Sequence, residues 1–153
     1  MNPIVKIMRA IASRGLRNVS ALDPSSSNRI PQPVPPDALP DGKMRLHLFG
    51  ATFESQSKAD RFCYEAPQPD FPEQLTRELD GAFIDTAQVE VICGPIQPRL
   101  LEFLDHENAD DIMLRLGADN SLIIITELAF GGMPYTLDDT ETLTYLGAIL
   151  VDV

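Results

Sequence analysis

The chain has 153 residues and carries 23 acidic and 12 basic side chains, which gives a formal net charge of −11 with both histidines neutral. This length suits one ordinary domain and is short for two. Because an excess of carboxylates repels phosphate groups, the composition argues against direct binding of DNA or RNA. It favours cationic partners, whose encounter with the chain would be fast and sensitive to salt.

A change of composition near residue 43 divides the chain into two parts. Residues 1–43 contain seven of the 13 prolines and six of the 12 basic residues, and five of these prolines fall in 30–40. Because proline fixes φ and removes an amide donor, we predict a basic N-terminal segment with a Pro- and Ser-rich linker. Residues 44–153 hold 20 of the 23 acidic residues and are predicted to form one acidic domain, for which Met44 could be the translation start.

The first twenty residues are basic and free of acid, and Ile4, Ile7, Met8 and Ile11 have helical spacing. This pattern is typical of a mitochondrial presequence or of a short helix on a membrane surface. The segment lacks the long apolar core of a secretory signal, and no apolar run reaches the roughly 20 residues that a membrane span requires. We therefore expect a cytoplasmic protein without integral membrane association, with an organellar protein as the alternative.

Hydrophobic spacing in the first half of the acidic domain alternates between strand and helix. Residues 44–49 indicate a strand. Ser55 or Ser57 is expected to cap a helix with one apolar face. The capping-box pattern Asp70–Glu73 then predicts a second helix, which ends near Gly81.

The second half continues the alternation. Residues 89–93 alternate as a strand, and Pro98 suits the first turn of a helix that runs to Leu104. Asn108 is expected to cap a further helix that ends at Gly117. The strongest strand signal is 121–130, whose start is apolar on both faces, so we predict a central strand there.

The last segment, 143–153, fits either a helix or a strand, and Gly147 with the Ile-Leu-Val run favours the strand. A long acidic connection over 131–142 would then join the last two strands. The sum is an α+β domain with a roughly four-stranded sheet packed by about four short helices, preceded by the Pro-rich extension.

Few side chains are available for nucleophilic or metal chemistry. The chain has two cysteines, Cys63 and Cys93, and two histidines, His47 and His106. Neither histidine lies in a hydrolase or zinc motif, and the cysteines lack zinc-finger spacing, so we predict free buried thiols. No Gly-rich phosphate loop or calcium loop is found. We predict no catalytic residue, no metal ligand and no cofactor.

Two acidic clusters are the most prominent polar features. One contains Asp105, Glu107, Asp110 and Asp111, and the other contains Asp138, Asp139 and Glu141. Each could be a solvated helix cap or loop, or an anionic patch that faces a basic partner. Clustered carboxylates also leave open a small hydrolase or metal-assisted enzyme.

Three stretches of the acidic domain carry a family resemblance. They are 53–62 (FESQSKADRF), 71–85 (FPEQLTRELDGAFID) and the closing strands, which contain LIIITELAF at 122–130 and then Tyr145-Leu146-Gly147. On these motifs residues 44–153 resemble the immunity protein 22 family of bacterial polymorphic-toxin systems, also described as domain of unknown function 4284. Residues 1–43 lie outside the likeness.

The resemblance implies a non-enzymatic cytoplasmic protein that binds and neutralises a co-produced toxin domain. A nuclease toxin is basic because it binds phosphates, so an acidic inhibitor can occupy the same surface. The two acidic clusters would pair with lysines and arginines of the toxin, around an apolar centre at Phe130, Met133 and Tyr135. The alternative for these three residues is packing beneath a loop. The oligomeric state is not predicted.

Overall fold

The computed structural model describes residues 41–80 and 82–153. The predicted N-terminal segment and most of the predicted linker therefore lie outside the described residues. The described strands are β1 (Lys43–Ala51), β2 (Val89–Cys93), β3 (Ser121–Thr126) and β4 (Thr144–Asp152). The described helices are α2 (Gln56–Tyr64), α3 (Gln74–Glu78), α4 (Gln97–Leu100) and α5 (His106–Leu116), with 3-10 turns η2 (Thr86–Gln88) and η3 (Glu127–Phe130).

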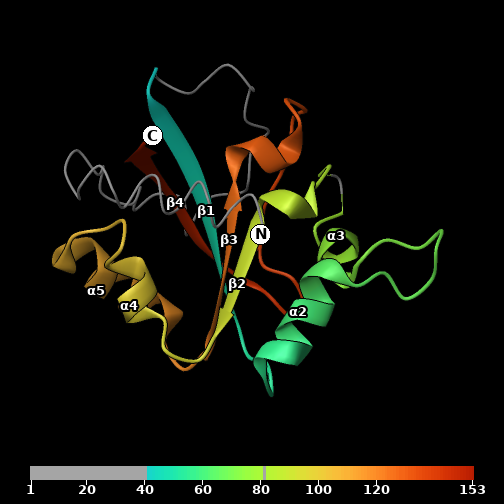
Figure 1. The fold of residues 1–153 in the computed structure, drawn as a ribbon, viewed down its shortest axis with the longest axis horizontal. Coiled ribbons are helices and arrows are strands. Elements are labelled where there is room, and N and C mark those ends of the chain that lie inside the picture. Colours follow the sequence, from blue (N-terminus) through green and yellow to red (C-terminus); the bar gives the residue numbers. More distant parts are fainter. Residues whose placement is uncertain (1–40, 81) are drawn as a thin grey trace.

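The four strands form one antiparallel sheet in the order β2-β3-β1-β4. Helices α4 and α5 cover one face, and α2 and α3 cover the other (Figure 1). The predicted α+β architecture is confirmed. The predicted last strand is also confirmed, since β4 pairs with β1 along most of its length.

Strand β3 shows why the sheet needs helices on both faces. All six of its residues are buried, and its four apolar residues alternate between the two hydrophobic cores. Leu122 and Ile124 pack under α4 and α5, whereas Ile123 and Ile125 pack under α2 and α3. A strand that is apolar on both sides must be central, as predicted.

Strand β3 ends at Thr126, so the prediction of a strand over 121–130 is wrong in its second part. Glu127 to Phe130 form η3, and Gly131 ends it in the left-handed conformation, with φ 61° and ψ 26°. The chain leaves the sheet where the Glu127 carboxylate turns inward to meet His47. A buried polar contact thus ends the strand although the sequence remains apolar.

Helix starts depend on which polar residue caps the first turn. Ser55 caps α2, because its Oγ accepts a hydrogen bond from the Lys58 amide. The predicted Asn108 cap is wrong: Asp105 caps α5, and its Oδ1 accepts from both the amide and the side chain of Asn108. The predicted box at Asp70 does not form either, since α3 has no side-chain cap.

Candidate functional site

The first acidic cluster belongs to α5. Asp105 caps the helix, Asp110 Oδ1 accepts a hydrogen bond from Gln97, and Asp111 forms an ion pair of 3.1 Å with Arg115. Asp105 thus completes the first turn of α5 and Asp110 joins α5 to α4, which is the structural alternative left open by the sequence. Glu107, the remaining member, is exposed.

The second acidic cluster lies in the connection between η3 and β4. Asp139 Oδ1 accepts from the amide of Tyr145 at 2.8 Å, so it secures the start of β4. Asp138 Oδ1 accepts from the amide of Asp139, and Glu141 is exposed. Next to them, Thr140 and Thr142 donate to the Glu78 carboxylate, which ties this connection to α3 and lowers the pKa of Glu78 despite its desolvation.

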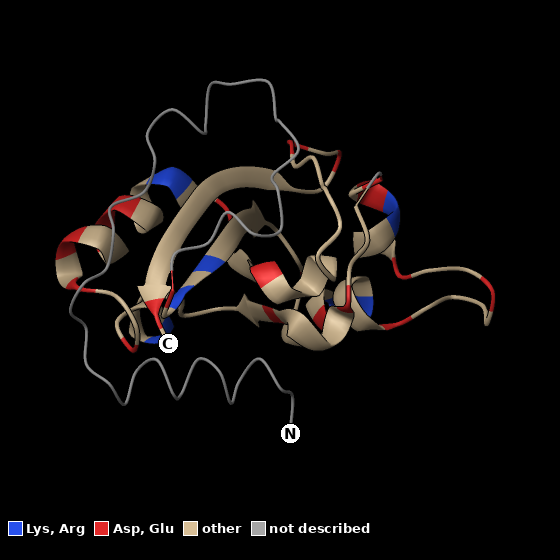
Figure 2. Cartoon of the chain, turned by 90° about the horizontal axis from the view of Figure 1, so that it is seen from above, with Lys and Arg blue, Asp and Glu red and all other residues tan. Residues whose placement is uncertain are grey.

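The structure does not bring the two acidic clusters together. The α5 cluster lies on one side of the sheet, and the connection that carries the second cluster is bonded to α3 on the other side through Thr140 and Thr142. Figure 2 likewise shows Asp and Glu on the helices and loops at both ends of the molecule. A single partner face containing all seven predicted carboxylates is therefore not present in the described residues.

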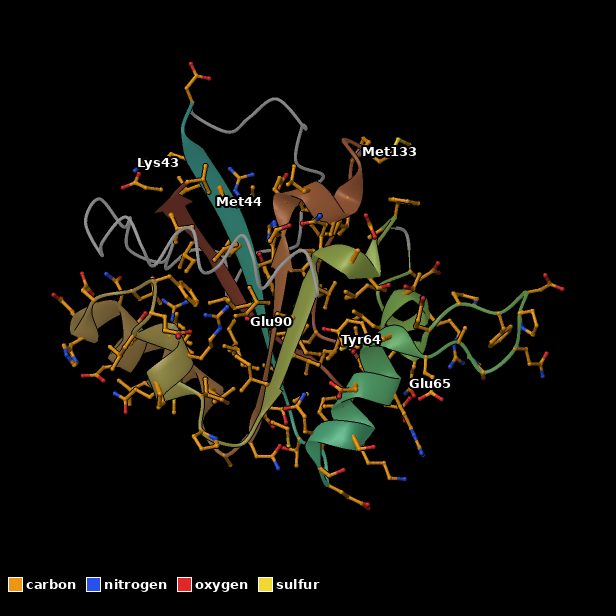
Figure 3. All side chains as sticks on the ribbon, viewed as in Figure 1. Lys43, Met44, Tyr64, Glu65, Glu90 and Met133 are labelled. Carbon is orange, nitrogen blue, oxygen red and sulfur yellow. The ribbon has the colours of Figure 1, made fainter. Side chains whose placement is uncertain are left out.

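The three predicted apolar contact residues also separate. Phe130 and Tyr135 are buried, at 1% and 3% exposure, whereas Met133 is 56% exposed. Phe130 and Tyr135 stack with ring centroids 3.9 Å apart beneath the turn. Packing under the loop is therefore the outcome for these two, and Met133 alone of the three faces solvent (Figure 3).

A buried polar network anchors this turn to the sheet. Tyr135 donates its hydroxyl hydrogen to the Glu127 carboxylate, with O–O distances of 2.8 and 2.9 Å. His47 Nε2 lies 2.9 Å from Glu127 Oε2, and its Nδ1 lies 3.1 Å from the Tyr145 hydroxyl. Arg45 completes the network with an Nη1 atom 3.8 Å from Glu127 Oε1.

The network is consistent with a neutral His47. With its hydrogen on Nε2, the ring donates to Glu127, and Nδ1 accepts from the Tyr145 hydroxyl. Desolvation by burial lowers the pKa of His47 and outweighs the nearby carboxylate. The hydrogen bonds from His47 and Tyr135, with the charge of Arg45, lower the pKa of Glu127 despite its own desolvation. Glu127 is therefore the buried anion of the cluster.

Cys63 and His47 are not arranged as a nucleophile and its base. The structure gives both ring nitrogens of His47 other partners. Both cysteines are free, as predicted, with Cys63 buried and Cys93 half-buried. Desolvation raises the pKa of the Cys63 thiol, so this group is a poor nucleophile. Within 41–80 and 82–153, no three His, Cys, Asp or Glu side chains are grouped so that they could hold a metal ion.

Exposed apolar side chains gather near the anchored turn. Phe83 is 59% exposed and packs against Gly131, where an added Cβ would lie 3.3 Å from the ring. Leu128 in η3 and Met133 after it are also more than half exposed. The amide of Asp85 donates to the Ala129 carbonyl, which joins the segment that carries Phe83 to η3. These contacts bring together the two segments that carry the three exposed apolar side chains.

A groove of about 500 Å³ extends from Phe83 toward the 66–73 loop. Phe71, which is 46% exposed, lies along the same groove together with the carboxylates of Asp70 and Glu73. No lysine or arginine lines it. We call Phe71, Phe83, Leu128 and Met133, together with Asp70 and Glu73, the acidic apolar surface.

Sequence reasoning found only Met133 of the acidic apolar surface. Phe71, Phe83 and Leu128 lie within stretches used for the family resemblance, but they carry no periodic signal for exposure. Phe83 packs against Gly131, which is distant in sequence, and Leu128 lies in η3 because β3 ends early. The available signal was that Phe83 lies two residues after Gly81, beyond the predicted helix end.

Comparisons with known proteins give no match for this chain: no family model, curated protein or solved structure matches it. The resemblance to the immunity protein 22 family therefore stays a prediction. Among the described residues, no helix has the length and apolar character needed to cross a membrane.

Proposed function

We propose that this chain is a non-enzymatic immunity protein, which neutralises a basic toxin domain by binding it through the acidic apolar surface. The observation that carries the proposal is that exposed Phe71 and Phe83 line one groove with two carboxylates, and that Phe83 packs against the turn between the exposed Leu128 and Met133. Contiguous apolar patches with a polar rim are typical of interaction sites. Aromatic and methionine side chains are enriched at the centres of protein interfaces.

The surroundings of the surface support a basic partner. Asp70 and Glu73 lie in the groove without a lysine or arginine in its lining. Carboxylates in this position attract lysines and arginines, which speeds encounter and fixes the orientation of the partner. The apolar side chains would supply the affinity once they are desolvated. As in the prediction from the sequence, carboxylates would surround an apolar centre, but at different residues.

The anchored turn would reduce the cost of binding. Tyr135, Glu127 and His47 hold the segment that presents Leu128 and Met133. A loop that is already ordered loses less conformational entropy when a partner binds. The buried network thus connects the fold to the proposed function.

The test is affinity capture of a basic protein by the tagged full chain, with the captured protein identified and its dissociation constant then measured. Phe83→Ala and Met133→Ala should each weaken binding by about tenfold or more, as for the central residues of an interface. Leu114→Ala is the matched control, since Leu114 is 81% exposed on α5 across the sheet. Equal affinities of all three variants would overturn the assignment of the surface.

A second pair of variants tests the charge argument. Asp70→Asn with Glu73→Gln should slow association and reduce its salt dependence. Glu107→Gln on α5 is the control for the first acidic cluster, and Glu141→Gln is the control for the second. If the α5 or Glu141 variant slowed association more than the groove variant, the partner would bind one of the clusters predicted from the sequence instead.

A further inference from the structure

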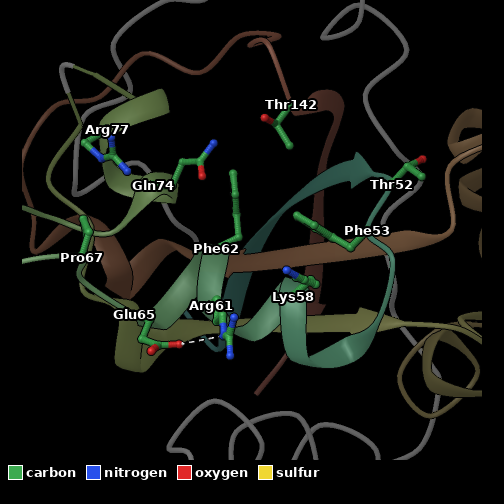
Figure 4. Close-up of a pocket in the computed structure, with 10 residues that line it drawn as sticks. All are labelled: Thr52, Phe53, Lys58, Arg61, Phe62, Glu65, Pro67, Gln74, Arg77 and Thr142. Atoms are coloured by element: carbon green, nitrogen blue, oxygen red, sulfur yellow. Dashed lines mark ion pairs between the residues drawn. The ribbon is translucent and has the colours of Figure 1, made fainter.

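A second groove, of about 380 Å³, lies between α2 and α3 and has the opposite charge. Lys58 and Arg61 on α2 stand on one side of it, Arg77 on α3 stands on the other, and Phe62 lies between them (Figure 4). Phe53 extends the apolar floor, with its ring centroid 5.2 Å from that of Phe62. We call this feature the basic groove.

The concentration of cations in this groove contrasts with the rest of the domain. Residues 41–153 contain seven lysines and arginines, of which three line the basic groove. The other four are paired with carboxylates, in the pairs Lys43–Asp152, Arg45–Glu127, Arg99–Glu90 and Arg115–Asp111. The three lysines and arginines of residues 41–153 that form no half-buried ion pair therefore all line the basic groove.

Within the groove the cations remain available to a ligand. Arg61 forms a 3.5 Å ion pair with Glu65, but both side chains are more than 60% exposed, so water screens the pair. Arg77 lies over the ring of Phe71, 4.8 Å from its centroid, which positions the guanidinium without neutralising it. Neither Lys58 nor Arg77 forms an ion pair within the described residues.

The shape of the groove favours an extended chain over an enclosed small molecule. Seven of its ten lining residues are exposed, whereas small-molecule sites enclose most of their ligand. Cations on both walls and aromatic rings on the floor complement a chain with carboxylates on either side of an apolar side chain. Arginine clusters recognise acidic motifs in this way.

We propose that the basic groove binds a short acidic segment of a partner protein, with carboxylates against Lys58, Arg61 and Arg77 and an apolar side chain on Phe53 and Phe62. This site adjoins the acidic apolar surface, because Arg77 lies over the ring of Phe71, but it does not depend on the proposed function. The acidic part of the domain repels an acidic segment, and among the residues that the structure describes this groove gathers the lysines and arginines that attract one.

The test is an NMR titration of the isotope-labelled full chain with the peptide acetyl-Glu-Glu-Phe-Glu-Glu-amide. Amide signals of α2, α3 and Thr52–Phe53 should shift, and replacing the glutamates by glutamine or the phenylalanine by glycine should weaken binding by about tenfold. Lys58→Gln and Arg77→Gln should each weaken it by about fivefold. Leu114→Glu is the matched control, because it makes the same change of net charge on the far side of the sheet.

Several results would overturn the proposal. They are equal binding of the glutamine peptide, an equal effect of Leu114→Glu, or the absence of shifts at the groove amides. The oligomeric state of the full chain is measured in parallel by light scattering. A dimer that Lys58→Gln dissociates would identify a second copy of this chain as the occupant and would overturn the assignment to a partner protein.

Discussion

Replacing Tyr135 by phenylalanine tests the network that anchors the exposed turn. Tyr135 is only 3% exposed, and the change removes its hydroxyl group. The Glu127 carboxylate then has one hydrogen-bond donor fewer. A hydrogen bond to a buried charged group contributes about 2 kcal/mol. That loss lowers the equilibrium constant for folding by about thirtyfold, and in a domain of this size it lowers Tm by about 8 °C.

The control is Tyr64→Phe, measured by urea and thermal unfolding under the same conditions. The Tyr64 hydroxyl also donates a hydrogen bond, at 2.8 Å, but its acceptor is the neutral Val89 carbonyl and the residue is 36% exposed. We expect a loss of about 0.5 kcal/mol there. Equal losses in the two variants, or an unchanged stability of Tyr135→Phe, would refute the claim that an ionised, desolvated Glu127 depends on Tyr135.

Three further predictions concern pH, backbone conformation and capping. Burial holds the pKa of His47 in the folded protein below its unfolded value of 6.5, so in acid His47 takes up a proton when the protein unfolds. The contribution of His47 to the free energy of unfolding is therefore full above pH 6.5 and falls below it. His47→Gln should reduce this fall in urea unfolding measured as a function of pH. Gly131→Ala should lower the free energy of unfolding by about 1–2 kcal/mol in the same assay, because φ is 61° and the new Cβ meets the ring of Phe83. An unchanged stability would contradict the left-handed turn. Asp105→Ala should lower the free energy of unfolding by about 1 kcal/mol through loss of the α5 cap, whereas Glu107→Ala should change it by less than about 0.5 kcal/mol. If thermal unfolding gave the reverse order, the assigned cap would be wrong.

Local signals predicted most of the fold. The apolar run at 121–126 identified a central strand, and Ser55 and Gly117 marked helix ends, because each signal depends on neighbours within a few residues. The cap of α5 was misplaced by one turn, since Asp105 and Asn108 are both good caps and the sequence does not rank them.

The candidate site was less predictable because it depends on distant contacts. Tyr135 looked like a surface aromatic in an acidic loop, yet it reaches His47, 88 positions earlier in the chain, and is buried. Phe83 gave no signal in the sequence, and Gly131, against which it packs, is distant in the chain. Five of the seven predicted carboxylates accept hydrogen bonds or form an ion pair within the domain, whereas Glu107 and Glu141 are exposed. Composition alone does not distinguish such contacts from a binding face.

The most direct test of the proposed function is the stoichiometry of neutralisation. The captured basic protein is expressed in a host cell whose growth it inhibits, and the full chain is co-expressed at graded levels. We predict that growth recovers when the chain reaches equimolar amounts and that Phe83→Ala shifts this point to higher amounts. Recovery far below equimolar amounts would indicate turnover by an enzyme, and recovery unaffected by Phe83→Ala would show that the acidic apolar surface is not the contact.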